Sequence, residues 1–80
     1  MEVTVKLFAM LNRYAPNQQK AGEPFHVVLP EGATIDDLVA HLSIPDREVK
    51  VAFVDGRARA GMFRLEPGAE VGIFPPVGGG

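Results

Sequence analysis

A single stripe of apolar residues near the middle of the chain limits the folds that are open to it. Its members recur at positions i, i+3, i+4 and i+7, which is the spacing of one face of an amphipathic helix. They are Ile35, Leu38, Val39 and Leu42. Thr34 suits the N-cap of this helix, Asp37 supplies a carboxylate version of the capping box, and Ser43-Ile44-Pro45 ends it. The sequence therefore predicts one main helix that packs its apolar face on a sheet.

Segments that alternate between apolar and polar residues flank the helix and predict the strands of that sheet. Met10–Tyr14 indicates one helical turn after the first strand, and Asp55-Gly56 predicts a two-residue hairpin after the third. The predicted strands are Glu2–Ala9, Phe25–Leu29, Val49–Val54, a short edge strand with Arg57 and Arg59, and a last strand that begins near Glu70. This order indicates an α+β fold with the helix on one face of a mixed sheet of about five strands.

The last strand runs into a segment that ends it. Pro75 has no amide proton for a strand ladder, and Phe74 before it is held in extended geometry, so the strand stops there. The final residues have no side chains and are Gly78, Gly79 and Gly80. Glycines at a chain end are by themselves typical of a disordered terminus. We expect one folded domain over residues 1–75 and a flexible glycine tail over residues 76–80.

Size, charge and hydropathy argue against several kinds of partner. With 80 residues the chain has room for one small core. Its formal net charge is −2 with acids and bases interspersed, which argues against nucleic acid or a membrane surface as a partner. No apolar run approaches the roughly 20 residues of a membrane span, and Met1-Glu2-Val3-Thr4 lacks the features of a signal peptide. We therefore expect a cytoplasmic protein.

Few side chains could carry chemistry. The chain has no cysteine and hence no thiolate or persulfide, so any sulfur that it moves must ride on its C-terminus. His26 and His41 have no third ligand at metal spacing, which favours surface histidines over a metal site. No glycine-rich loop follows a strand and opens a helix, so we see no nucleotide site. We expect the chain to bind no cofactor and to catalyse nothing alone.

Several segments, in the same order along the chain, resemble the MoaD/ThiS family of sulfur carriers. Phe74-Pro75-Pro76-Val77-Gly78-Gly79-Gly80 is similar to the family's C-terminal signature, above all in its molybdopterin synthase branch. Val5–Leu11 resembles the family's first strand, and Leu29–Leu38 resembles the lead into its main helix. Leu65–Phe74 extends the likeness over nearly the whole chain. The resemblance implies a ubiquitin-like β-grasp fold.

The same resemblance implies chemistry at Gly80. In the family, an activating enzyme adenylates the terminal glycine carboxylate with ATP, and a sulfur donor then converts it to a thiocarboxylate. The tail that enters the enzyme sites corresponds here to Gly78, Gly79 and Gly80. In the molybdopterin branch the small subunit inserts this tail into the large subunit of molybdopterin synthase and supplies sulfur for the molybdenum cofactor. Glycines suit this task because a side chain near the terminus would widen the slot that must exclude water.

Two phenylalanines are candidates for binding the activating enzyme. Phe8 and Phe74 are each out of phase with the core residues of their own strand, and each lies at its strand's end. If the first and last strands are parallel neighbours, as the resemblance implies, the two rings share the face opposite the helix, beside the tail. The resemblance also implies that they contact the enzyme, with Pro75, Pro76 and Val77 completing the surface. The alternative is that both rings pack beneath neighbouring loops.

Other functions remain compatible with these residues. A ubiquitin-like modifier would join Gly80 to a lysine of another protein, and it shares the adenylation step. A carrier of this kind could also supply thiamin or tungsten-pterin synthesis. A plain interaction domain would leave its tail unactivated. The sequence does not separate these alternatives.

Overall fold

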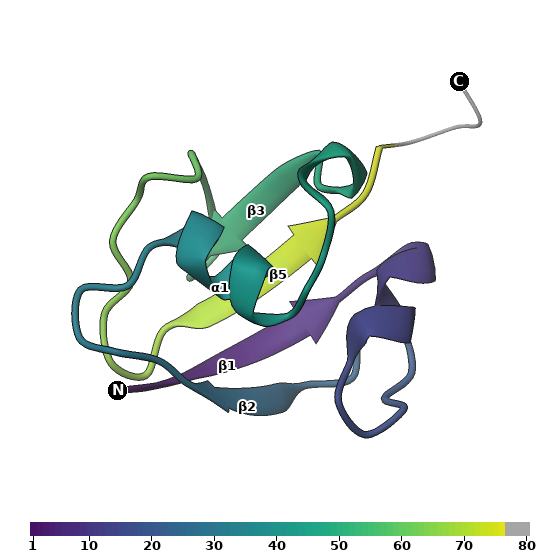
Figure 1. Cartoon of the computed structure of the whole chain (residues 1–80), viewed down its shortest axis with the longest axis horizontal. Helices are drawn as coiled ribbons and strands as arrows, with labels where there is room; N and C mark the ends of the chain where they lie inside the picture. Colours follow the sequence, from purple (N-terminus) through teal and green to yellow (C-terminus); the bar gives the residue numbers. More distant parts are fainter. Residues whose placement is uncertain (77–80) are drawn as a thin grey trace.

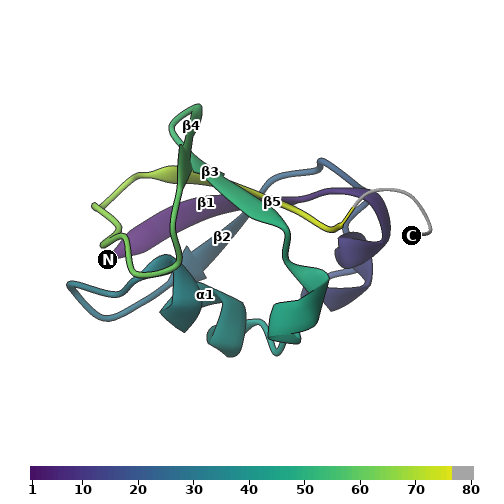
Figure 2. The ribbon, with the colours of Figure 1, turned by 90° about the horizontal axis from the view of Figure 1, so that it is seen from above.

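Five strands form one mixed sheet, and a single α-helix covers one of its faces in the computed structural model, which describes residues 1–76 (Figures 1 and 2). The strands are β1 (Glu2–Leu7), β2 (Phe25–Val28), β3 (Val51–Val54), β4 (Arg57–Arg59) and β5 (Glu70–Phe74). The helix is α1 (Ile35–His41), and two short 3-10 helices are η1 (Ala9–Tyr14) and η2 (Asp46–Glu48). This arrangement confirms the predicted α+β fold with one main helix.

The first and last strands pair in the middle of the sheet. The strand order is β2-β1-β5-β3-β4, and β1 runs parallel to β5 with Val5 beside Val71 and Leu7 beside Ile73. All other neighbours are antiparallel. Because parallel strands end at the same edge of a sheet, the C-terminal ends of β1 and β5 lie side by side (Figure 1). The chain therefore leaves the sheet next to the point where its first strand turns away.

The core lies between α1 and the sheet. Alternate residues of β1 and β5 point into it, and the most deeply buried include Val5, Leu38 and Ile73, each with no exposed surface. The neighbouring strand β3 contributes Ala52 and Val54. Alternation within each strand then forces the intervening side chains onto the other face, which no helix of residues 1–76 covers (Figure 2). The open face is the part of the sheet that remains available to a partner.

The start of α1 is fixed by the capping box that the sequence predicts. The amide N–H of Asp37 donates to Thr34 Oγ1 at 3.1 Å, and the N–H of Thr34 donates to Asp37 Oδ2 at 2.9 Å. The next free N–H groups donate to the loop before β5, Ile35 to the Phe63 carbonyl and Asp36 to the Gly61 carbonyl. These bonds join the helix to the sheet.

Three predicted strand boundaries are wrong by one or two residues, and the smallest difference is at the second strand, which ends at Val28 rather than Leu29. The first strand ends at Leu7 rather than Ala9, because Ala9 takes a left-handed conformation with φ of 53° and opens η1. The third begins at Val51 rather than Val49, because the residues after Pro45 form η2. Among the described helices, none has both the length and the apolar character that crossing a bilayer requires.

Candidate functional site

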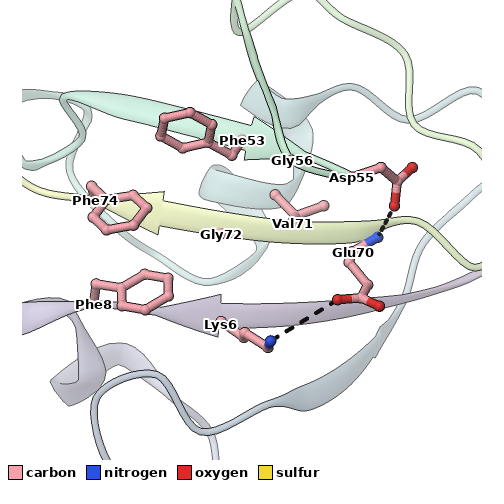
Figure 3. A pocket seen from close by; sticks show the side chains of 9 residues that line it. All are labelled: Lys6, Phe8, Phe53, Asp55, Gly56, Glu70, Val71, Gly72 and Phe74. Atoms are coloured by element: carbon pink, nitrogen blue, oxygen red, sulfur yellow. Dashed lines mark hydrogen bonds and ion pairs between the residues drawn. The ribbon is translucent and has the colours of Figure 1, made fainter.

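Two aromatic rings stack on the open face at the C-terminal ends of β1 and β5. The rings of Phe8 and Phe74 are nearly parallel, with an angle of 2° between their planes and 4.2 Å between their centroids. Phe53 from β3 meets the Phe74 ring edge-on, at a centroid distance of 5.6 Å (Figure 3). The structure thus confirms the predicted meeting of Phe8 and Phe74 and adds a third ring to it.

Glycine lies directly beneath this stack. A β-carbon built on Gly72 would stand 3.2 Å from Cε2 of Phe8 and 3.8 Å from Cε1 of Phe74. On the other side, the loop before β2 approaches Phe8, and a β-carbon on Gly22 would lie 3.4 Å from its Cε1. The N–H of Gly22 donates to the Leu7 carbonyl at 2.8 Å and holds that loop in place. Phe8 is therefore partly covered by a loop, as the alternative interpretation expected, and still forms one wall of an open pocket.

The rings border a pocket of about 620 Å³ on the open face. Its opposite rim is charged, with Lys6 Nζ 4.0 Å from a carboxylate oxygen of Glu70 (Figure 3). Asp55 anchors the same rim, because its carboxylate accepts the N–H of Glu70 at 3.0 Å and its own N–H donates to the Glu70 carbonyl at 2.9 Å. An apolar centre with a polar rim is the usual anatomy of a protein interface.

Backbone hydrogen bonds pair β5 with its neighbours up to its last residue, Phe74, and the strand ends there. The N–H of Phe8 donates to the Ile73 carbonyl at 3.1 Å, and the N–H of Lys50 donates to the Phe74 carbonyl at 2.8 Å. Pro75 and Pro76 follow outside the strand, half-buried and exposed respectively. The predicted end of the strand before Pro75 is confirmed. The aromatic pocket therefore lies at the root of the C-terminal segment.

Four of the five predicted tail residues lie outside the described part of the chain. These are Val77, Gly78, Gly79 and Gly80. The flexible tail over residues 76–80 and the role of Gly80 accordingly remain predictions. What the described residues give is the place from which such a tail would start.

Sequence reasoning did not identify Phe53 as a member of this site. Alternation along β3 puts Val51 and Phe53 on one face, but the sequence does not say which face is buried. The answer depends on the pairing of β3 with β5, which places Phe53 opposite Gly72 and Val51 opposite Phe74. The feature that marks Phe53 as a member of the site is its position opposite a glycine of the next strand. That position can be identified only when the strand register is known.

The two histidines lie apart from the pocket. His26 on β2 stands 3.7 Å from a carboxylate oxygen of Glu2, and both side chains are mostly exposed. His41 occupies the last turn of α1 and is exposed. Within residues 1–76, no three His, Cys, Asp or Glu side chains gather closely enough to hold a metal ion.

Comparisons with known proteins agree with this geometry. The model of the ThiS family matches residues 5–80. The fold superposes on a Pyrococcus furiosus protein described as a candidate subunit 1 of molybdopterin converting factor, with 27% identity, a TM-score of 0.72 and coverage of 96% of this chain and 99% of that one. SAMP1 from Haloferax volcanii is 28% identical over the full length of both chains, with a TM-score of 0.70.

A more distant likeness supports the assignment of the fold and nothing further. A chain of the complex of subunits 1 and 2 of the Helicobacter pylori molybdopterin-converting factor is 21% identical over the full length of both chains, with a TM-score of 0.61. A search of curated proteins found no match.

Proposed function

The chain belongs to the ThiS family, among the MoaD/ThiS sulfur carriers and ubiquitin-like β-grasp proteins, and from this premise we propose that it carries sulfur as a thiocarboxylate on Gly80. The recipient that we favour is molybdopterin, the organic part of the molybdenum cofactor. One observation carries the proposal: the stack of Phe8 and Phe74 forms an apolar surface at the root of a segment whose family match runs through Gly80.

The proposed loading reaction needs two steps at Gly80. Its carboxylate oxygen attacks the α-phosphorus of ATP on the activating enzyme, and pyrophosphate leaves. Hydrosulfide, HS⁻, from a sulfur donor then attacks the acyl carbon, AMP leaves with the former carboxylate oxygen, and loss of the sulfur-bound proton gives the thiocarboxylate. Because an acyl-adenylate hydrolyses readily, the enzyme has to exclude water around it. Since the first step consumes ATP, we propose a cytoplasmic location.

The chain's own contribution is to present the tail and to bind the enzyme. Aromatic side chains in a desolvated pocket tend to dominate binding energy. Phe8 and Phe74 are prearranged by the parallel pairing of β1 with β5, so little side-chain entropy is lost when a partner covers them. Lys6, Glu70 and Asp55 on the rim would fix the orientation through charge.

The acceptor that we propose is a large subunit of molybdopterin synthase. The Pyrococcus furiosus relative is described as subunit 1 of a converting factor, and the Helicobacter pylori one comes from a complex of subunits 1 and 2. In such a complex this chain would supply the tail and the large subunit would supply the catalytic groups. Pro75, Pro76 and Val77 would line the path of the tail into it.

Intact mass spectrometry tests the loading reaction. The chain is incubated with the activating enzyme encoded in its own genome, ATP and a sulfide source. We expect the mass change of one oxygen exchanged for one sulfur, located to Gly80 by fragmentation. Gly80→Ala is expected to fold normally and to load poorly, whereas Ala60→Gly, an exposed change just after β4, is expected to load like the wild type. Equal loading of Gly80→Ala would contradict the proposal.

A second candidate function is protein modification. The likeness to SAMP1, a small archaeal modifier protein, favours it. In that case the activated Gly80 forms an isopeptide bond with a lysine of another protein, and AMP or a thiol leaves. Mass spectrometry of the protein recovered from its native cell separates the two functions: a lysine conjugate through Gly80 supports modification, and a thiocarboxylate supports sulfur transfer to a small molecule.

A further inference from the structure

A second groove borders Pro75 and Pro76, here called the tail root, on the side away from the aromatic pocket. In Figure 1 the chain leaves β5 between two short 3-10 helices, the dark blue η1 and the teal η2. In Figure 2 both lie on the α1 side of the sheet. The groove between them has a volume of about 410 Å³. Its walls include Met10, Leu11, Arg47, Glu48, Pro75 and Pro76.

A polar network ties the two walls together. Arg13 from η1 donates to the Glu48 carboxylate of η2, and the Tyr14 hydroxyl donates to the same carboxylate at 2.8 Å. Arg13 also donates to the Met10 carbonyl at 3.1 Å. Glu48 is thus occupied by two partners from the opposite wall, and its side chain is only 22% exposed. The groove is held in shape without the tail.

Two groups on these walls are left available. Within residues 1–76, no carboxylate lies within 4.0 Å of the Arg47 guanidinium, while Arg13 is already paired. Met10 is 72% exposed, which is unusual for so large an apolar side chain. Ala9, just before it, is held at φ of 53°, a conformation that costs a residue with a β-carbon about 1 kcal/mol. Residues in such sparsely populated backbone conformations cluster at active sites and ligand-binding sites.

We propose that this groove is a second docking surface, which receives an acidic segment of the activating enzyme with an apolar side chain beside its carboxylate. Arg47 would pair with the carboxylate, and Met10 with the prolines would cover the apolar side chain. This inference rests on the function proposed above. The enzyme would then grip the tail root from both faces of the sheet, with the aromatic pocket on one side and the groove on the other.

The reach of the tail explains why the enzyme must cover this groove. Gly80 is the fourth residue after Pro76, and an extended chain advances roughly 3.3–3.6 Å per residue, so the reacting carboxylate stands no more than about 14 Å from Pro76. The walls of a site that encloses the carboxylate therefore close over the tail root. Continuity through Pro75 and Pro76 joins the groove to the path of the tail. A free cation on that path selects an acidic partner.

Two matched pairs of variants test the proposal with the full chain and its activating enzyme. Arg47→Glu is compared with Arg64→Glu, an equal change of net charge at an exposed residue of the loop before β5, where Arg64 forms a β-bridge with Thr34 at the start of α1. Met10→Ser is compared with Met62→Ser. The Met62 side chain is 81% exposed, and its neighbours in sequence accept hydrogen bonds from the start of α1. The measurements are the KM of the carrier in ATP-pyrophosphate exchange, the Kd for the enzyme, and thermal unfolding.

We expect Arg47→Glu and Met10→Ser each to raise KM and Kd by roughly three- to tenfold, because each removes one partly exposed contact. The loss for Arg47→Glu should shrink at high salt. Both Arg64→Glu and Met62→Ser should match the wild type, and all four variants should unfold near the wild-type temperature. Arg47→Ala should show an intermediate loss.

Two results would overturn the groove as a docking surface. One is unchanged KM and Kd for both Arg47→Glu and Met10→Ser. The other is an equal loss in Arg64→Glu, which would indicate a general charge effect rather than a local contact. Both results require a wild-type chain that is activated, so they differ from failure of the proposed function, in which the wild type itself gives no exchange.

Discussion

The ring of Phe8 lies over Gly72, so closely that a β-carbon at residue 72 would stand 3.2 Å from its Cε2 atom. Few real β-carbons make so close a contact. Gly72 lies in β5, and Phe8 follows the end of β1. Because Gly72 has no side chain, the Phe8 ring can occupy the space above it. The stack with Phe74, and hence the aromatic pocket, depends on this pair.

Gly72→Val is expected to displace the Phe8 ring. A branched side chain cannot share the space, and overpacking of this kind typically costs about 1–3 kcal/mol. We expect a lower free energy of unfolding and the loss of the Phe8–Phe74 contact in nuclear Overhauser spectra. Ala58→Val is the control, because it adds the same side chain to the exposed strand β4. An intact ring contact in Gly72→Val would show that the ring is not held as described.

Phe8→Ala and Phe74→Ala are expected to weaken docking far more than folding. Both rings are half-buried on the open face, and truncation of an aromatic anchor commonly costs about 2 kcal/mol or more of binding, roughly a thirtyfold rise in Kd. The measurement is the Kd for the activating enzyme by calorimetry. Phe63→Ala is the matched control, because Phe63 is also half-buried but stacks against Arg59, away from the pocket.

The double variant Phe8→Ala/Phe74→Ala measures how far the two rings act together. Stacked aromatic pairs are worth about 0.5–1.5 kcal/mol beyond their buried area, so the losses in unfolding free energy should not add. We expect the double variant to lose less stability than the sum of the single ones. Strict additivity would mean that the stack contributes nothing to the fold.

Ala9→Gly is expected to stabilise the fold although it removes a methyl group. Ala9 holds a left-handed conformation that suits glycine, and relief of about 1 kcal/mol of strain outweighs the added freedom of the unfolded chain. We expect a gain of up to about 0.5 kcal/mol in chemical denaturation. The same substitution at Ala40, within α1, should instead lose about 0.5–1 kcal/mol. Equal signs for the two variants would contradict the strain at Ala9.

Thr34→Ala is expected to lower the free energy of unfolding by about 1 kcal/mol, because it removes the side-chain acceptor of the capping box. The helix has only seven residues, so its first turn is a large part of it. Thr34→Ser keeps the hydroxyl and should stay close to the wild type. Urea denaturation followed by circular dichroism gives both values.

Local signals predicted the elements whose causes are local. The capping residues Thr34 and Asp37 marked the start of α1, and Pro75 marked the end of β5. The phase of Phe8 and Phe74 relative to their strands, taken with the family's strand order, was enough to bring the two rings together. In each case the deciding residues are neighbours in sequence, or the pairing was supplied by the resemblance.

Features that depend on pairing between distant segments were not predicted. The role of Phe53 follows from its position opposite Gly72, which alternation within β3 does not contain. The network of Arg13, Tyr14 and Glu48 joins residues more than thirty positions apart, and nothing near Glu48 in the sequence points to η1. The left-handed Ala9 has no sequence signal, since alanine normally avoids that conformation.

The proposed recognition through Phe8 and Phe74 requires the central pairing of β1 with β5. The ring of Phe8 comes from the beginning of the chain and that of Phe74 from near its end, and only the finished sheet brings them within 4.2 Å. Long-range pairing of this kind forms late, after the intervening chain has been ordered. An enzyme that binds both rings would therefore bind only the folded chain. An incomplete or misfolded chain would not be loaded, even with its glycines intact.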